Sequence, residues 1–212
     1  MTLTARTFVV DQRSSLYPQG LRLAMRGRAP EALVSMGELG VLQGKPVALF
    51  CSVRCPGRLI LQTYDLTQAL RAAGVTVISG FHSPMEKECL NLLLRGSQPV
   101  IVCPARGIEE MRVPSAWRPS LDGGRLLVVS PFPKGPARVD ARLAARRNEV
   151  VAALAEEVFI SYAAPGGGME TLARWVLGSG KPVLTFEAEE NRSLIALGAT
   201  PVTQERWWPR GG

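Results

Sequence analysis

Short apolar runs that alternate with segments of helical periodicity constrain this chain more than any other feature. Runs at 46–51, 75–78, 99–103, 125–129, 158–162 and 182–186 have the length and composition of buried strands. Helical spacing follows at 59–73, 85–95, 141–155 and 170–177, and residues 193–198 predict a short helix before a last strand at 200–203. This alternation predicts an α/β fold, a parallel sheet with helices on both faces.

The two ends of the chain do not show this alternation. Residues 1–40 lack a strand pattern, and the stretch 14–36 predicts a small helical N-terminal annex to a domain of residues 41–205. Residues 206–212 predict a tail, whose adjacent Trp207 and Trp208 would need a partner surface. No apolar run approaches the roughly 18 residues of a membrane span, and the N-terminus does not resemble a secretory signal, so we expect a cytoplasmic protein without membrane contact.

Basic residues gather in two separate parts of the sequence. The net charge is +7 over 212 residues; residues 1–60 and 104–147 carry +5 each, residues 61–103 are neutral and residues 148–212 carry −3. If the fold brings the two basic segments together, they form one cationic face of the kind that binds polyanions. Arginine supplies 21 of the 25 basic residues and suits bidentate phosphate contacts. A codon bias toward Arg, Ala, Gly and Pro explains the composition equally well.

Several kinds of catalytic or metal site are excluded by rare residues. The chain has one histidine, His82, which rules out a zinc site built on several histidines and leaves one candidate for a Ser-His-Asp triad. The four cysteines form no C-x-x-C pair, so we expect reduced thiols, with reactivity at Cys51 or Cys55 as the minority interpretation. We therefore expect no metal, no cofactor and no catalytic residue.

Ligands of parallel α/β sheets bind in the crevice beyond the carboxyl ends of the strands, so the loops that follow the strands are the candidate site. Gly166, Gly167 and Gly168 lie between a strand and a helix, where backbone N–H groups and a positive helix end favour a phosphate over a plain tight turn. Ser52 and Arg54 follow the first apolar run and could bind phosphate, the alternative being an exposed loop.

Two further segments complete the candidate site. Ser79 and Gly80 end the next run, where they either contribute to an anion site or only turn the chain. Lys134 lies on a Pro/Gly-rich loop, and Arg147 and Asn148 lie on the following helix; together they favour a phosphate-binding face over a merely solvated one. Stacking surfaces for bases could come from the aromatic side chains Phe81, Trp117 and Phe132.

The order of these segments resembles the DNA-processing protein A (DprA, or Smf) family. The stretch at 17–21 is similar to a Tyr-Pro segment that precedes the family's first strand, and 147–154 (RNEVVAAL) resembles its R-N-R-I-I-A-G-L. The glycine loop with the residues after it, 166–172 (GGGMETL), resembles the family's S-G-S-L-x-T-A, and 194–199 (LIALGA) matches its closing L-I-x-x-G-A. The first loop, C-S-V-R, departs from the family's G-S-R, and only Ser79-Gly80 remain of its second loop.

This resemblance implies a Rossmann-like core and a function without catalysis. It implies binding of single-stranded DNA, help in loading a RecA-type recombinase during DNA uptake and recombination, and a homodimer. Two alternatives stay open. The sequence P-G-G at 165–167 also resembles the LOG-type nucleotide-binding proteins and phosphoribohydrolases, although Met169 stands where those have glycine. The changed loops also fit a degenerate scaffold that ignores nucleic acid.

Overall fold

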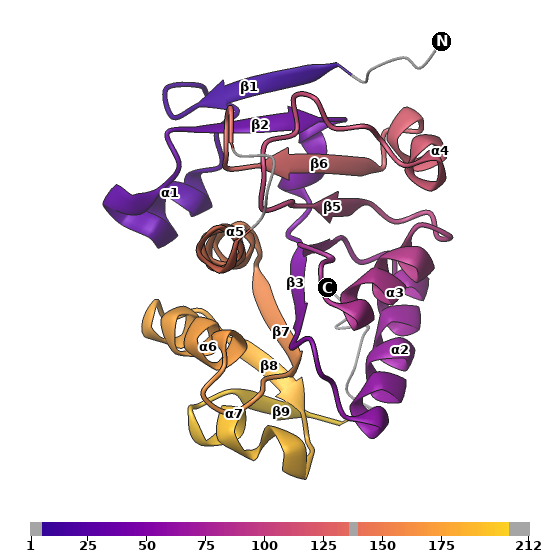
Figure 1. The fold of residues 1–212 in the computed structure, drawn as a ribbon, viewed down its shortest axis with the longest axis vertical. Helices are drawn as coiled ribbons and strands as arrows, with labels where there is room; N and C mark the ends of the chain where they lie inside the picture. The colour runs from indigo at the N-terminus through magenta and orange to yellow at the C-terminus, as the bar shows by residue number, and fades with distance from the viewer. Residues whose placement is uncertain (1–5, 136–139, 204–212) are drawn as a thin grey trace.

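The computed structural model describes residues 6–135 and 140–203, and it places their strands in one mixed sheet (Figure 1). The sheet order is β1-β2-β6-β5-β4-β3-β7-β8-β9. The strands are β1 Thr7–Asp11, β2 Ala32–Met36, β3 Val47–Cys51, β4 Val77–Ser79, β5 Val100–Val102, β6 Leu126–Ser130, β7 Glu157–Tyr162, β8 Val183–Phe186 and β9 Thr200–Val202. All seven strands from β3 to β9 run parallel to one another, as the alternating pattern predicts.

Helices lie on both faces of this sheet. The α-helices are α1 Gln19–Met25, α2 Gly57–Ala72, α3 Pro84–Leu93, α4 Arg118–Asp122, α5 Ala141–Leu154, α6 Gly168–Gly178 and α7 Arg192–Ala196. Short 3-10 helices are η1 Arg26–Arg28, η2 Leu39–Gln43, η3 Ser115–Trp117 and η4 Glu189–Asn191. In Figure 1, α2 and α3 lie on one side of the central strands, and α5 and α6 lie on the other. The prediction of a Rossmann-like α/β fold is confirmed.

The first forty residues differ from the prediction. Only 19–25 form the expected α-helix, while 7–11 and 32–36 form β1 and β2, which extend the main sheet in antiparallel fashion. The absence of strands expected there is therefore wrong. β2 is buried from Leu33 to Met36 because β1 and β6 flank it, whereas β1 is an edge strand with exposed Phe8 and Val9. The tail residues Trp207 and Trp208 lie outside the described residues.

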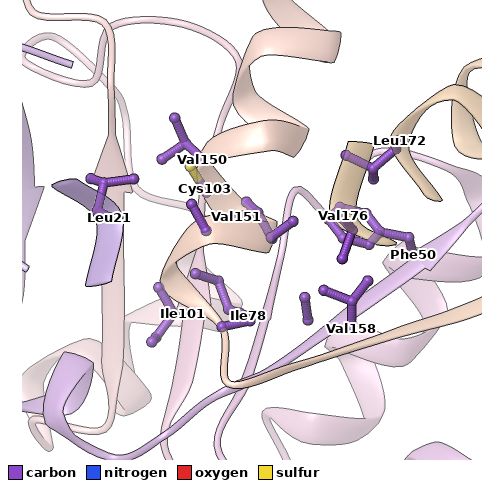
Figure 2. Close-up of a cluster of buried hydrophobic side chains, with 14 of the residues drawn as sticks. Leu21, Phe50, Ile78, Ile101, Cys103, Val150, Val151, Val158, Leu172 and Val176 are labelled. Carbon is purple, nitrogen blue, oxygen red and sulfur yellow. The ribbon is translucent and has the colours of Figure 1, made fainter. Parts of the chain in front are cut away.

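The core consists of two apolar layers divided by the sheet. Alternate residues of β3 point to opposite faces: Ala48 and Phe50 join one layer, and Val47, Leu49 and Cys51 join the other. Figure 2 shows the first layer, where Val150 and Val151 of α5 lie over the strand residues Ile78 and Ile101, with Leu172 and Val176 of α6 beside them. Burial on both faces explains why the central strands read as unbroken apolar runs.

The order of the strands reverses between β3 and β7. From β3 the chain proceeds outward through β4 and β5 to β6, and it then returns through α5 to place β7 on the other side of β3. The loops that follow β3 and β7 therefore leave adjacent strands in opposite directions. In open α/β sheets this switch point is where a ligand-binding crevice forms.

Candidate functional site

Ser52 joins the loop after β3 to the glycine loop after β7. Its backbone N–H donates to the Tyr162 carbonyl at 2.9 Å, and its hydroxyl accepts from the Ala164 N–H at 3.0 Å. A serine hydroxyl that accepts one hydrogen bond still has its own proton to donate. Arg54, two residues on, is exposed. The structure thus brings these two predicted residues to the switch point, next to the glycine loop.

The glycine loop forms the N-terminus of α6. Gly166 has φ +68°, a left-handed conformation that favours glycine, and Gly167 caps the helix with its own N–H bonded to the Ala164 carbonyl. A Cβ at position 167 would lie 2.9 Å from that carbonyl oxygen. Gly168 begins the helix and is exposed. All three glycines therefore lie in the loop that Ser52 contacts through Ala164.

An acidic side chain already faces this helix end. Glu170 Oε2 accepts a hydrogen bond of 2.7 Å from the Gly166 N–H, and its Oε1 pairs with Arg174 at 2.7 Å. The hydrogen bond from the Gly166 N–H lowers the pKa of Glu170 most, and the pair with Arg174 lowers it further. The carboxylate is therefore ionised. Glu170 therefore occupies a position where the glycine loop would offer an N–H group to a phosphate.

Ser79 and Gly80 turn the chain after β4. Ser79 is buried, and its hydroxyl accepts from the Phe81 N–H at 3.2 Å. Phe81 has φ +47° and its ring is buried, so that ring offers no stacking surface, contrary to the expectation. Gly80 is covered by Arg147: a Cβ at position 80 would lie 1.5 Å from Nη1.

Arg147 is buried, with 4% of its surface exposed. Its Nη1 donates to the Cys103 carbonyl at 2.9 Å, and its Nε donates to Asn148 Oδ1 at 2.7 Å. The guanidinium of α5 thereby links the loops that follow β4 and β5. Asn148 is half-buried and retains its amide nitrogen as a donor.

Glu86 is a buried carboxylate behind these loops that the sequence analysis missed. Its Oε1 accepts from the Cys51 N–H at 3.1 Å, and its Oε2 accepts from the N–H groups of His82 at 2.8 Å and Ser83 at 3.3 Å. Burial raises the pKa of Glu86, while these N–H groups and Arg147 act in the opposite direction. The Ser83-x-x-Glu86 pattern is a capping box and could have predicted the contact with Ser83, but not the contact with Cys51.

Lys134 lies on the loop after β6, which contacts the loop after β5. Its backbone N–H donates to Glu109 Oε1 at 2.8 Å, and the Ser130 hydroxyl donates to the Arg106 carbonyl at 2.6 Å. The side chains of Lys134 and Arg106 are exposed. Phe132 is half-buried on the same loop, and Trp117 is partly buried against the core. Lys134 follows β6 and Ser52 follows β3, and these two strands are three positions apart in the sheet. Both residues lie at the same, carboxyl edge.

The described residues contain no group of three or more His, Cys, Asp or Glu side chains that could hold a metal ion. Among these same residues, no helix is both long and apolar enough to cross a bilayer. A groove of about 880 Å³ lies at the opposite, amino edge of the sheet, where Tyr17, Pro18 and Lys45 line it. This groove therefore lies away from the loops that hold the predicted site residues.

One family model matches most of this chain, and solved structures share its fold. The model of the DNA recombination-mediator protein A family matches residues 8–206. The fold is similar to DprA of Streptococcus pneumoniae, with 20% identity and a TM-score of 0.75 over 95% of this chain and 72% of that one. It is also similar to DprA of Helicobacter pylori, whose structure is described in terms of single-stranded DNA binding, with 18% identity and a TM-score of 0.72 over 93% of this chain and 89% of that one.

A molybdenum cofactor binding protein of Rippkaea orientalis shares the fold more distantly, with 13% identity and a TM-score of 0.54 over 75% of this chain and 90% of that one. No curated protein matches the sequence. The family model covers nearly the whole chain, including β2 and all but the first residue of β1. The chain belongs to the DNA recombination-mediator protein A family.

Proposed function

We propose that the protein binds single-stranded DNA along the carboxyl edge of its sheet, as a recombination mediator without catalytic activity. The observation that carries this proposal is the bridge from Ser52 to Ala164 and Tyr162, which holds the loop of Arg54 beside the glycine loop. The family membership and the single-stranded DNA named for the H. pylori relative support the choice of ligand.

The proposed edge extends from the loop after β6 to the loop after β7. Five adjacent strands span about 19 Å at a spacing of roughly 4.8 Å. Lys134 and Arg106 lie toward one end and Arg54 lies toward the other, all of them exposed. Cations spaced along an edge contact phosphates whatever the base sequence, which suits a chain that must hold DNA non-specifically. The half-buried Phe132 is the aromatic candidate for base stacking.

The remaining predicted residues have different roles in this proposal. At the switch point the Ser52 hydroxyl and the Gly168 N–H donate to a phosphate, and the Gly166 N–H does so once Glu170 releases it. Gly167 shapes the turn, because its N–H is bonded to the Ala164 carbonyl. Ser79, Gly80 and Arg147 position the loops, because their polar groups already bond within the protein. Asn148 is the α5 residue with a free amide donor beside them, since its oxygen is held by Arg147.

Two further parts of the proposal concern partners. We infer a cytoplasmic protein that loads a RecA-type recombinase onto the bound strand, as the resemblance to the family implies.

We also assign a homodimer interface to the exposed face of α2, where Ile60, Leu61 and Tyr64 form an apolar stripe. Arg58 and Asp65 lie on one flank of that stripe, seven residues apart. Two antiparallel copies related by a two-fold axis near Leu61 would pair each Arg58 with the partner's Asp65.

A titration of the intact protein against a fluorescent oligothymidylate over a salt series tests the DNA proposal. We expect affinity that falls steeply with salt, and Arg54→Ala should weaken it about tenfold at low salt and reduce the slope by about 0.7. Arg95→Ala is the matched control, because Arg95 is exposed between α3 and β5 at the amino edge. Arg147→Ala is unsuitable, since it removes a buried link between loops.

The same experiment separates the alternatives. Wild-type protein that fails to bind at low salt, or an Arg54→Ala variant that binds like wild type, overturns the proposal. Release of free base from nucleoside monophosphates would instead identify a LOG-like hydrolase. The ionised Glu170, held by Gly166 and Arg174, is poorly suited to donate a proton, which favours binding over hydrolysis. A chain that does neither but forms a dimer would be a scaffold.

A further inference from the structure

The loop after β3 begins and ends with a cysteine. Cys51 is the last residue of β3 and is 3% exposed, whereas Cys55 is half-buried at the outer end of the loop. Both thiols are reduced, and both side chains pack against the same apolar layer. The two thiols are close enough for each to shift the pKa of the other, and Cys55 Sγ donates to the Pro56 carbonyl oxygen at 3.7 Å.

This contact divides the four thiols into two kinds. The neighbouring Cys51 thiol lowers the pKa of Cys55, and the same interaction, together with burial, raises the pKa of Cys51. Cys89 and Cys103 are fully buried, and burial raises the pKa of each to about 12. Because the thiolate is the reactive form, Cys55 is the most reactive of the four and also the most accessible.

We propose that Cys51 and Cys55 form a reversible disulfide when the protein meets hydrogen peroxide. The Cys55 thiolate attacks one peroxide oxygen, the O–O bond breaks, and the released hydroxide takes up a proton to give water and a Cys55 sulfenic acid. The Cys51 sulfur then attacks the Cys55 sulfur, and the Cys51 proton leaves with the sulfenic hydroxyl as a second water. Peroxide is reduced, and the two thiols are oxidised.

The position of the pair gives this modification a structural consequence. The disulfide would close a ring that contains Ser52, Val53 and Arg54, the loop whose base is fixed by the bonds from Ser52 to Tyr162 and Ala164. Cys51 is in addition fixed through its backbone N–H to Glu86. Oxidation would thereby restrict Arg54 without unfolding β3. The disulfide itself does not depend on the proposed binding of DNA.

Peptide mapping of the intact protein tests the proposal. After brief exposure to peroxide under native conditions, free thiols are alkylated and the chain is cut with trypsin without reduction. Trypsin cuts after Arg54, between the two cysteines, and Lys45 is protected by Pro46. We expect a cross-linked species that joins peptide 29–54 to peptide 55–58, that disappears on treatment with a dithiol, and that leaves Cys89 and Cys103 unoxidised.

Two variants test which cysteines form the cross-link. Cys55→Ser should abolish the cross-link and leave Cys51 reduced, and Cys89→Ser should leave the cross-link unchanged. A cross-link between Cys55 residues of two chains, oxidation of Cys55 to the sulfinic acid without a cross-link, or equal oxidation of all four cysteines would each overturn the proposal.

Discussion

The guanidinium group of Arg147 lies against the backbone of Gly80, so closely that a Cβ at position 80 would be 1.5 Å from Nη1 and 1.9 Å from Cζ. The contact brings α5, which follows β6, onto the loop that follows β4. It also holds Arg147 in reach of the Cys103 carbonyl. One buried arginine therefore fixes the relative positions of two loops of the candidate site.

Replacing Gly80 with alanine should destabilise the protein by about 2–3 kcal/mol, because the added methyl group displaces a buried guanidinium from its hydrogen bonds. Denaturant unfolding measures the change as a lower midpoint. Gly57→Ala is the matched control: a Cβ there meets nothing within 4 Å, and we expect a change within about 0.5 kcal/mol. Equal midpoints for Gly80→Ala and wild type would show that Arg147 can move aside without cost.

The sequence predicts the central sheet because a strand buried on both faces is apolar at every position. β3 shows this directly, since its five buried residues are all apolar, and β6 does so except at its last residue, the buried Ser130. β1 is not predicted because it is an edge strand, and with one of its five residues buried it does not need an apolar run. β2 is not predicted because Ser35 interrupts its short apolar run. In the structure Ser35 is fully buried, and its hydroxyl donates to the Phe8 carbonyl.

The candidate site is predicted only as a set of loops. The rule that ligands bind beyond the carboxyl ends of parallel strands locates Ser52, Arg54 and the glycine loop. This rule does not predict which arginine side chains are exposed and which are buried. The burial of Arg147 depends on Gly80 and Cys103, which are distant in sequence. The bond from Glu86 to Cys51 spans 35 residues and is unpredictable for the same reason.

The pH dependence of stability should carry the signature of Glu86. Burial raises its folded pKa above the ordinary value of 4.5, so the native state binds more protons than the unfolded state above pH 4.5. Stability therefore falls as pH rises from 4.5 through the folded pKa and is constant beyond it. Glu86→Gln removes this dependence, and it costs about 1–3 kcal/mol at the acidic end because an amide NH₂ faces backbone N–H donors.

Urea unfolding of both proteins between pH 4.5 and pH 8 measures this difference. We expect the stability advantage of wild type over Glu86→Gln to shrink as pH rises. Glu88→Gln is the control, since Glu88 is exposed on the same helix and should give a flat difference. An advantage that grows with pH would mean that the N–H groups and Arg147 outweigh burial.

The proposed α2 interface predicts a dimer that charge can break and restore. Leu61→Asp should convert the dimer to a monomer, because it places carboxylates at the two-fold axis in a stripe that wild type leaves apolar. Arg58→Asp should weaken the dimer by opposing the partner's Asp65, and the double variant Arg58→Asp with Asp65→Arg should restore it. Sedimentation measures the association, with Leu23→Asp on the exposed face of α1 as control. A Leu61→Asp variant that remains dimeric would exclude this face.

Glu170 should limit the affinity of the candidate site for DNA. Its carboxylate takes the Gly166 N–H and holds Arg174, so it competes with a phosphate for the N-terminus of α6 and repels it. Glu170→Gln removes the negative charge and releases Arg174, and we expect oligothymidylate to bind about two- to fivefold more tightly at low salt, with the gain lost at high salt.

Glu38→Gln is the control for this prediction, because it changes the net charge equally at the amino edge and should have little effect on DNA affinity. Equal affinity of the two variants would show that the glycine loop does not contact DNA, and weaker binding by Glu170→Gln would show that the carboxylate supports the loop that binds it.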